Sequence, residues 1–262
     1  MATTATTATP APAAAAADDP GRALVVGASS GIGAALVRRL AADGWRVAAL
    51  ARREGELREL AGGCAGLPGS VHVHAHDVTD TGAVPALFER LVRELGGLDL
   101  AIYAAGIMPA VGRDKYDTEK DHAILAVNVG GCIAWGNAIA RLFATQRRGT
   151  LVGISSIAGV RGRKGQPAYG TSKAAMDHYL EALRNRLAEV GAHVCTIKPG
   201  FVDTPMTEGL GLRGAISAER AADEILRAAR RGADTRYVPL RWLGVALVVR
   251  NIPSFLFKRL NI

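Results

Sequence analysis

Short apolar runs recur along the chain, separated by longer segments in which apolar and polar residues mix. The first run, at 23–26, ends at a glycine, as a buried strand of a parallel sheet often does. The same pattern predicts further strands at 45–50, 70–76, 98–104, 150–155 and 193–198. The segments between them predict helices at 32–40, 84–95, about 114–144 and 169–189. The chain therefore alternates strand and helix over most of its length.

Strands that alternate with helices indicate right-handed crossovers, which give a parallel sheet with helices on both faces. We expect an α/β fold, a doubly wound parallel sheet of the Rossmann type, in a single domain. The 262 residues suit one domain with tails. The predicted boundaries are a disordered tail at 1–20, a main, dinucleotide-binding domain at 21–239 and an apolar, basic helical extension at 240–262.

The two ends of the chain differ in composition from the rest. After Met1, residues 2–20 are only Ala, Thr, Pro and Asp, without the cationic start and apolar core of a secretory signal, so a disordered tail is expected. In 240–262 the longest run without a charge is 242–249, far shorter than the roughly 20 residues that span a bilayer.

Composition excludes several classes of protein. An apolar content of 49% is too high for a disordered chain. Three scattered cysteines, Cys64, Cys132 and Cys195, fit neither a disulfide scaffold nor a metal site, and favour reduced thiols in the cytoplasm. The formal net charge of +8 raises the idea of a nucleic-acid partner. The basic residues are spread in ones and twos without a basic tract, so we expect a solvated surface and no nucleic acid.

A glycine-rich turn connects the first predicted strand to the first predicted helix. Glycines there let the backbone turn tightly and approach a pyrophosphate, while the helix start supplies amide donors. The predicted cofactor contacts in this turn are Gly27, Ser29, Ser30, Gly31, Ile32 and Gly33.

The second predicted strand ends in two arginines, Arg52 and Arg53, about 20 residues beyond the turn. This position normally meets the adenosine ribose, where an acidic residue would bind the 2′-hydroxyl. Guanidinium groups favour a 2′-phosphate instead, so the expected cofactor is NADP(H) rather than NAD(H). The alternative is a pair of solvated arginines with no ligand.

Tyr169 and Lys173 lie four residues apart and so on one face of a predicted helix. A tyrosine titrates near 10, and a neighbouring ammonium group lowers that pKa toward the range useful for acid–base catalysis. Ser156 follows the fifth predicted strand at its carboxyl end, where ligands of open α/β sheets bind. Its hydroxyl could hold a carbonyl oxygen that the tyrosine protonates.

Together these residues resemble the short-chain dehydrogenase/reductase family in its compact form, over roughly residues 22–238. The resemblance rests on segments that occur in the family's order. They are the glycine turn, Asp77–Val78, residues 103–106, Asn128, Ile154–Ser156, the Tyr169–Lys173 pair and Pro199–Gly200. It implies an NADP(H)-dependent oxidoreductase that transfers hydride between nicotinamide and a carbonyl or alcohol substrate.

The resemblance also implies a role for each matching residue. Ser156 would polarise the carbonyl, Tyr169 would be the general acid or base, Lys173 would lower the tyrosine pKa and hold the nicotinamide ribose, and Asn128 would support a proton relay. The remaining implied cofactor contacts are Asp77, Val78, Ala104, Ala105, Gly106, Pro199, Gly200, Val202 and Thr204, with Tyr169 and Lys173 again.

The chain departs from the family pattern at a few positions. Val26 stands where threonine is frequent, and Tyr103 and Ala104 stand where asparagines are usual. We expect these changes to remove side-chain hydrogen bonds that stabilise the central sheet. The four catalytic positions are intact, which argues for an enzyme. The alternative is a protein that binds NAD(P)H as a sensor or interaction partner without turnover.

Further features suggest sites or partners less directly. His72, His74 and His76 share one strand face but lack further ligands, so no metal site is expected. Arg161, Arg163 and Lys164 could receive an anionic substrate group, although a solvated loop is the preferred reading.

Two other segments bear on the substrate and on assembly. The apolar segment 203–215 resembles a lid and favours a lipophilic substrate. For 240–262, packing on the protein is preferred over membrane-surface contact. A homodimer through the helices near 115–145 and 169–189 is expected.

Overall fold

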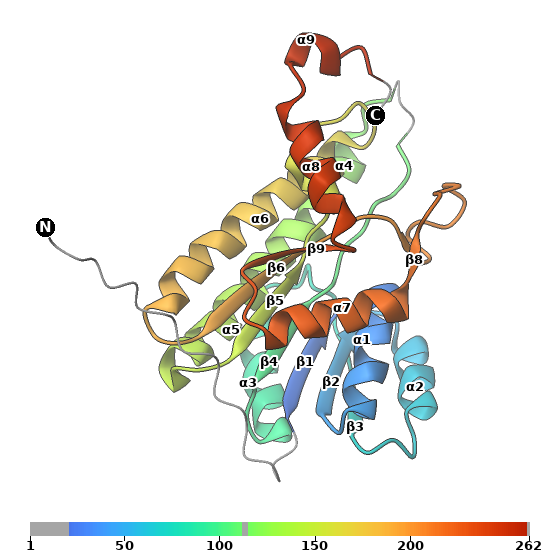
Figure 1. The fold of residues 1–262 in the computed structure, drawn as a ribbon. Helices are drawn as coiled ribbons and strands as arrows, with labels where there is room; N and C mark the ends of the chain where they lie inside the picture. The colour runs from blue at the N-terminus through green and yellow to red at the C-terminus, as the bar shows by residue number, and fades with distance from the viewer. Residues whose placement is uncertain (1–20, 112–114, 261–262) are drawn as a thin grey trace, which may run out of the picture.

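The structure, a computed structural model, describes residues 21–111 and 115–260, so the tail predicted at 1–20 lies outside the described residues. Within the described part, one parallel sheet has seven strands (Figure 1). They are β1 (Arg22–Val26), β2 (Arg46–Ala51), β3 (Ser70–Ala75), β4 (Leu100–Tyr103), β5 (Thr150–Ile154), β6 (His193–Pro199) and β9 (Thr235–Val238). A separate short pair joins β7 (Val202–Asp203) to β8 (Ile216–Ser217).

The strand order is β3-β2-β1-β4-β5-β6-β9. The chain starts in the middle of the sheet, builds outward to β3, then crosses back and builds outward to β9. β1 therefore pairs with β2 on one side and with β4 on the other, and Val26 lies opposite both Leu50 and Tyr103. The doubly wound parallel sheet predicted from the sequence is confirmed. The order in which the chain adds strands reverses between β1 and β4, and open sheets bind ligands at such a point.

Helices cover both faces of the sheet (Figure 1). Their bounds are α1 (Gly31–Ala42), α2 (Glu54–Gly63), α3 (Val84–Leu95), α4 (Thr118–Leu125), the π-helical turn η1 (Ala126–Gly131), α5 (Cys132–Gln146), the 3₁₀ turn η2 (Ile157–Val160), α6 (Pro167–Ala188), α7 (Ala218–Arg230), α8 (Arg241–Asn251) and α9 (Ser254–Phe257).

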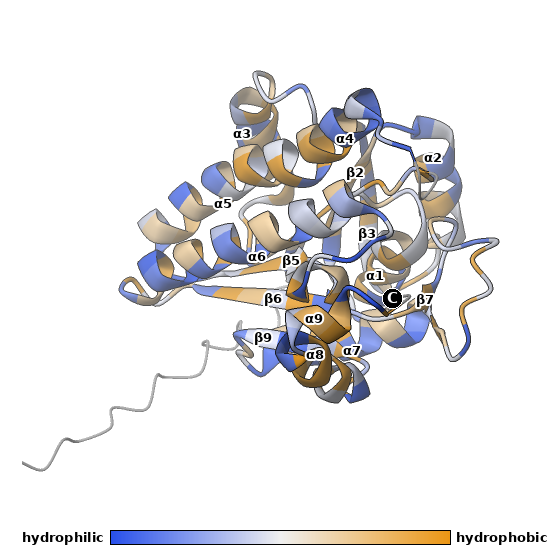
Figure 2. Ribbon diagram, turned by 90° about the horizontal axis from the view of Figure 1, so that it is seen from above, coloured by the Kyte–Doolittle hydropathy of each residue, from blue (hydrophilic) through white to orange (hydrophobic). Residues whose placement is uncertain are grey.

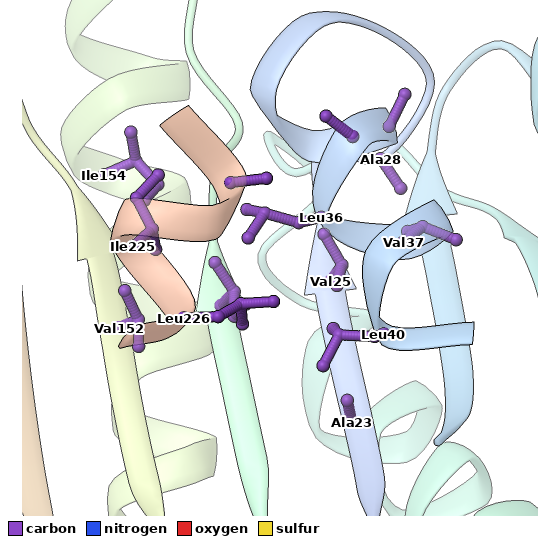
Figure 3. Packing of buried hydrophobic residues seen from close by; sticks show 14 of the residues in the cluster. Ala23, Val25, Ala28, Leu36, Val37, Leu40, Val152, Ile154, Ile225 and Leu226 are labelled. Carbon is purple, nitrogen blue, oxygen red and sulfur yellow. The ribbon is translucent and has the colours of Figure 1, made fainter. Parts of the chain in front are cut away.

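Successive side chains of β1 point to opposite faces of the sheet and belong to two separate cores. Ala23 and Val25 face a core built with α1, α2 and α7, in which Leu36 and Leu226 pack between helices and sheet (Figure 3). The intervening Leu24 belongs to a second core, built on the opposite face with α3, α5 and α6. Because both faces of the strand are buried, it is apolar at almost every position.

Three elements of the structure were not predicted from the sequence: α2, α7 and β9. The buried face of α7 is mostly alanine, with Ile225 and Leu226 as its largest side chains, and it recurs at regular helical spacing, so an amphipathic helix could have been predicted there. In α2 only Leu57 and Leu60 are buried, and in the edge strand β9 only Val238 is. α2 and β9 therefore bury too little apolar surface to show in a hydrophobic pattern.

α4, η1 and α5 form one continuous helical segment, Thr118–Gln146, which is 29 residues long. By length and composition it could cross a membrane, because an 18-residue window within it has a mean hydropathy of 1.6. Its middle and end, however, place Trp135, Ile139 and Phe143 fully inside the second core. The segment is therefore a core helix of the fold.

α8 and α9 follow the edge strand β9 and lie beyond the carboxyl edge of the sheet (Figure 1). The predicted extension thus contains two helices, mainly apolar in composition and placed at the outside of the molecule (Figure 2). Ala246 is the one buried residue of α8. The extension packs on the domain through a narrow face and leaves much of its apolar surface exposed.

Candidate active site

A cavity of about 700 Å³ opens at the carboxyl ends of the strands, around the point between β1 and β4 where the strand order reverses. Pockets for small molecules and cofactors span about 300–1,000 Å³. Every site residue expected from the sequence lines this cavity except Asp77 and Asn128. Lining residues that were not among the predicted site residues include His76, Ile107, Met108, Ser155, Met206 and Thr207.

The glycine turn forms one end of the cavity. Gly27 has a φ of 91°, and a Cβ placed there would clash with the backbone of Ala105. At Gly33 a Cβ would clash with the carbonyl oxygen of Gly27, so this glycine lets the helix start pack directly on the turn. The first residues of α1 then border the cavity with amides suited to an anion.

Arg53 is fixed against this turn. Its guanidinium donates to the hydroxyls of Ser29 and Ser30, at 2.9 and 2.8 Å. It also lies 3.2 Å from the carboxylate of Glu56. About half of the Arg53 side chain stays exposed, so a cation is held beside the helix start at the cavity wall.

Arg52 lies beside Asp77, with 3.7 Å between its guanidinium and the carboxylate. Asp77 accepts hydrogen bonds from the backbone and side chain of Thr79, at 2.9 and 2.8 Å. Burial acts to raise the pKa of Asp77, but these bonds and the Arg52 charge outweigh it and hold the pKa below its usual value. Asp77 itself does not line the cavity, whereas its neighbour Val78 does.

Ser156 and Tyr169 meet at the other end of the cavity. Ser156 lies just beyond β5, and its hydroxyl accepts the amide of Ala158 at 3.1 Å as the cap of η2. Tyr169 lies in the first turn of α6 and is 8% exposed. Burial raises its pKa above the usual value, while the hydrogen bond with Ser156 and the charge of Arg163 act in the opposite direction.

Lys173 lies one turn further along α6 and is almost fully buried. Its ammonium donates to the carbonyl of Ile154 at 2.9 Å and lies 5.8 Å from the centre of the Tyr169 ring. Burial lowers the pKa of Lys173 to about 8. The expected lowering of the Tyr169 pKa by Lys173 stays a prediction, because here the ammonium is directed at the strand carbonyl.

Asn128 lies in the π-helical turn η1 and is fully buried. Its side chain accepts from the amide of Ile107 at 2.8 Å and donates to the carbonyl of the same residue at 3.1 Å. It also donates to Ser172 at 3.0 Å, and Ser172 donates to the carbonyl of Tyr169 at 2.7 Å. Asn128 thus connects the loop after β4 to the first turn of α6 from behind the cavity.

Tyr103 makes a side-chain hydrogen bond that the sequence did not reveal. The loss of the asparagine bonds expected at this position stays a prediction, but the hydroxyl of Tyr103 donates to the carbonyl of Val127 at 2.6 Å. A Cβ at Gly131 would lie 2.5 Å from that hydroxyl oxygen. Tyr103 therefore ties β4 to the turn that holds Asn128, in space left by Gly131.

The segment after β6 closes the cavity. Trp242 of α8 lies against Gly200, where any Cβ would clash with the indole, and its ring meets that of Phe201 at 4.7 Å between centres. Thr207 donates to the carbonyl of Val202 at 2.7 Å and so folds the following segment back over the pocket. In this predicted lid Met206 is 40% exposed.

Arg161 has a different role from the anion contact considered for its loop. It donates to the carbonyl of Val249 at 2.8 Å and to that of Ile252 at 2.5 Å, at the end of α8. Its guanidinium also stacks 3.9 Å from the centre of the Phe257 ring. Arg161 therefore holds the extension against the domain.

The three histidines of β3 have separate surroundings. His72 bonds with Ser70, His74 lies 3.2 Å from the carboxylate of Glu94, and His76 packs edge-on against Trp135. Within residues 21–111 and 115–260, no three His, Cys, Asp or Glu side chains lie close enough together to hold a metal ion.

Comparison with known proteins gives a consistent result. The family model described as short chain dehydrogenase matches residues 22–213. An uncharacterized oxidoreductase of Myxococcus xanthus is 38% identical over 185 residues, covering 71% of this chain and 73% of its own. An uncharacterized oxidoreductase of Mycobacterium tuberculosis is 32% identical over 247 residues, covering 93% of this chain and 99% of its own.

Solved structures of short-chain type dehydrogenase/reductases share the fold. One from Mycobacterium marinum has a TM-score of 0.76 at 28% identity, over 83% of this chain and 93% of its own. One from Mycobacterium ulcerans has a TM-score of 0.77 at 23% identity, over 83% of this chain and 88% of its own, and shows the fold alone.

Proposed function

The chain belongs to the short chain dehydrogenase family and is an oxidoreductase of that family, and we propose that it is an NADP(H)-dependent enzyme that interconverts a carbonyl and an alcohol. One observation carries the proposal: a single cavity joins the glycine turn and Arg53 at one end to Ser156, Tyr169 and Lys173 at the other. The family uses a nicotinamide cofactor, and a dinucleotide is long enough to occupy both ends.

The residues of this cavity fit such a cofactor. The helix start beside Gly31 would hold the pyrophosphate with backbone amides. Arg52 and Arg53 lie where an adenosine ribose is expected, and guanidinium groups pair with a phosphate better than with a hydroxyl. This donor set supports NADP(H). When bound, the cofactor supplies or accepts a hydride at its nicotinamide ring.

The chain's own residues supply orientation and the proton. Ser156 would orient the substrate oxygen, and Tyr169 would give that oxygen a proton in reduction or remove one in oxidation. Lys173 would bring a positive charge close to the phenol when substrate and cofactor displace its present contacts. Asn128 would fix the backbone around Tyr169 through Ser172, and its expected proton relay to Lys173 belongs to the proposal.

The substrate class follows from the walls of the pocket. Ile107, Met108 and Met206 line the cavity and are apolar. They support a lipophilic carbonyl or alcohol, which would gain free energy by burying apolar surface there. The expected homodimer through α5 and α6 also belongs to the proposal.

The test replaces Tyr169 by phenylalanine. Wild-type protein should consume NADPH with lipophilic aldehydes or ketones, and Tyr169→Phe should lower kcat by about 10²-fold or more, because it removes the general acid. Tyr179→Phe, which removes a phenol hydroxyl that bonds to α5 and does not line the cavity, is the matched control and should keep activity. NADPH binding should persist in both variants. Tight NADPH binding by the wild type without turnover in either direction would replace the proposal with the sensor alternative.

A further inference from the structure

The extension at the end of the chain exposes an unusual amount of apolar surface. Among the described residues, eight of the twelve exposed large hydrophobic side chains lie between Leu240 and Leu260. The most exposed are Val248 at 64%, Phe255 at 59% and Leu247 at 55%. They come from both α8 and α9, which lie at the outside of the molecule (Figure 2). We call this the α8–α9 surface. Contiguous apolar patches of this kind mark contact with a protein or a membrane.

The charge of the same segment has one sign. After Asp234 the chain contains no further Asp or Glu, whereas 235–262 contains five basic residues. Four of them, Arg241, Arg250, Lys258 and Arg259, are exposed next to the apolar side chains. An apolar surface flanked by cations alone is complementary to a partner that combines apolar and anionic chemistry.

The α8–α9 surface is firmly attached to the domain. Trp242 packs on Gly200 and Phe201 beside the cavity. At the other end of α8, Arg161 donates to the carbonyls of Val249 and Ile252, and its guanidinium stacks on Phe257. The side chains that make these contacts point toward the domain. The exposed apolar side chains are therefore left for an external partner.

The positive charge of the α8–α9 surface distinguishes between two candidate partners, a second copy of the chain and an anionic membrane. A second copy of the chain, related by a twofold axis, would bring the same four cations from each protomer together without any acidic residue of this segment to balance them. A bilayer that contains anionic phospholipid supplies both negative headgroups and an apolar interior. α8 has 11 residues, so it is about 16 Å long and could lie on a bilayer without crossing it.

We propose that the α8–α9 surface docks the protein on anionic phospholipid membranes, with its apolar side chains inserted at the interface and its basic side chains among the headgroups. The sequence alone favoured packing of this segment on the protein, and the structure shows that this packing uses only one narrow face. The docking does not depend on the proposed reaction, because it rests on residues outside the cavity. Docking would hold the pocket near the lipid, since Trp242 touches both the extension and Gly200 at the cavity wall.

The experiment is co-sedimentation of the full chain with vesicles. Wild-type protein should bind vesicles of phosphatidylcholine mixed with phosphatidylglycerol, bind vesicles of phosphatidylcholine alone at least about tenfold more weakly, and lose affinity as salt is raised. Val248→Glu combined with Phe255→Glu should abolish binding. Ile133→Glu combined with Tyr116→Glu, which places the same two charges at exposed positions outside the extension, should not.

A second pair of variants separates charge from apolar contact. Replacing Arg250, Lys258 and Arg259 by glutamine should weaken binding to anionic vesicles by about tenfold or more. The same three-charge change at Arg58, Arg90 and Arg93, which are exposed on α2 and α3, should have little effect.

Three outcomes would overturn the proposal. They are failure of the wild type to bind anionic vesicles, binding that the α8–α9 variants and their controls affect equally, and a concentration-dependent dimer that Val248→Glu with Phe255→Glu dissociates while no vesicle binding is seen. The last outcome would assign the surface to a second copy. Thermal unfolding of every variant verifies that the fold is intact. The failure of NADPH turnover would leave these results unchanged.

Discussion

The hydroxyl of Tyr103, at the end of β4, donates a 2.6 Å hydrogen bond to the carbonyl of Val127 in the π-helical turn η1. The next residue in that turn is Asn128, which bonds to Ile107 and Ser172. A π-helical turn leaves backbone groups without their regular helical partners, and such turns occur frequently at functional sites. Tyr103 connects a carbonyl of this turn to β4 and so holds the turn that positions Asn128.

The first prediction concerns the space that Gly131 leaves for this phenol. Gly131→Ala would put a Cβ 2.5 Å from the Tyr103 hydroxyl, so we expect it to lower the free energy of unfolding by about 1–3 kcal/mol. Gly130→Ala has room for its Cβ and should be neutral or slightly stabilising, as Gly to Ala in a helix normally is. In the Tyr103→Phe background the cost of Gly131→Ala should shrink. Urea unfolding of the wild type, the two single variants and the double variant measures this change. If the two substitutions lower the free energy of unfolding additively, the contact between Gly131 and Tyr103 is contradicted.

The second prediction concerns the cofactor. Arg53→Gln should weaken NADPH binding by about 10- to 100-fold, because one charge-assisted contact to phosphate is lost, and should leave NADH binding nearly unchanged. Arg58→Gln removes a guanidinium that pairs with Glu54 on the outside of α2, and serves as the control. Fluorescence titration with both nucleotides gives the two dissociation constants. Equal affinity of the wild type for NADPH and NADH would refute the proposed preference for NADP(H).

The third prediction concerns the burial of Lys173. Its pKa is about 8 in the folded protein and 10.5 when exposed, so between these values the unfolded chain binds more protons. The free energy of unfolding contributed by this residue should therefore rise as pH increases from about 8 to 10, by at most about 1.4 kcal/mol per pH unit.

The measurement compares urea unfolding of the wild type and Lys173→Met across this range. The stability difference should shift in favour of the wild type as the pH rises. The same comparison with Lys164→Met, at an exposed position, should stay flat. A flat difference for Lys173→Met as well would mean that this ammonium is not desolvated by folding.

The fourth prediction concerns the attachment of the extension. Arg161→Gln loses the charged donors to the carbonyls of Val249 and Ile252, so we expect α8 and α9 to open more often. Trypsin should then cut after Arg250, Lys258 or Arg259 about tenfold faster or more. Arg163→Gln in the same loop is the control. The urea midpoint of the main domain should not change, and an unchanged cleavage rate would argue against the role of Arg161.

Much of the fold and of the site could be predicted because the signals are local. The glycine turn, Tyr169 with Lys173, and Ser156 after a strand each depend on spacing within one element or one turn. The topology of a parallel sheet then places the carboxyl ends of its strands on one edge, which is why residues as distant as Gly27 and Thr204 line one cavity.

The parts that could not be predicted depend on contacts between distant segments. Tyr103 meets Val127 across 24 residues, and Arg161 meets Val249 across 88. Nothing in the local pattern around either residue indicates its partner. Asn128 does not line the cavity because its side chain is bonded to Ile107 and Ser172, and the sequence does not show these contacts. α7 differs from these cases, because its buried residues recur at helical spacing and a local signal was present.

The π-helical turn also has a consequence for insertions and deletions in the gene. Each residue of an α-helix rotates the chain by about 100°, and a π-helical turn accommodates one residue beyond the regular repeat. Deleting a single codon within 126–131 could therefore let α4 and α5 join as an ordinary helix. The core side chains of α4 and α5 would keep their places, while the residues of the turn would lose the arrangement in which Asn128 meets Ile107 and Ser172. One lost codon could thus leave a folded chain without this network.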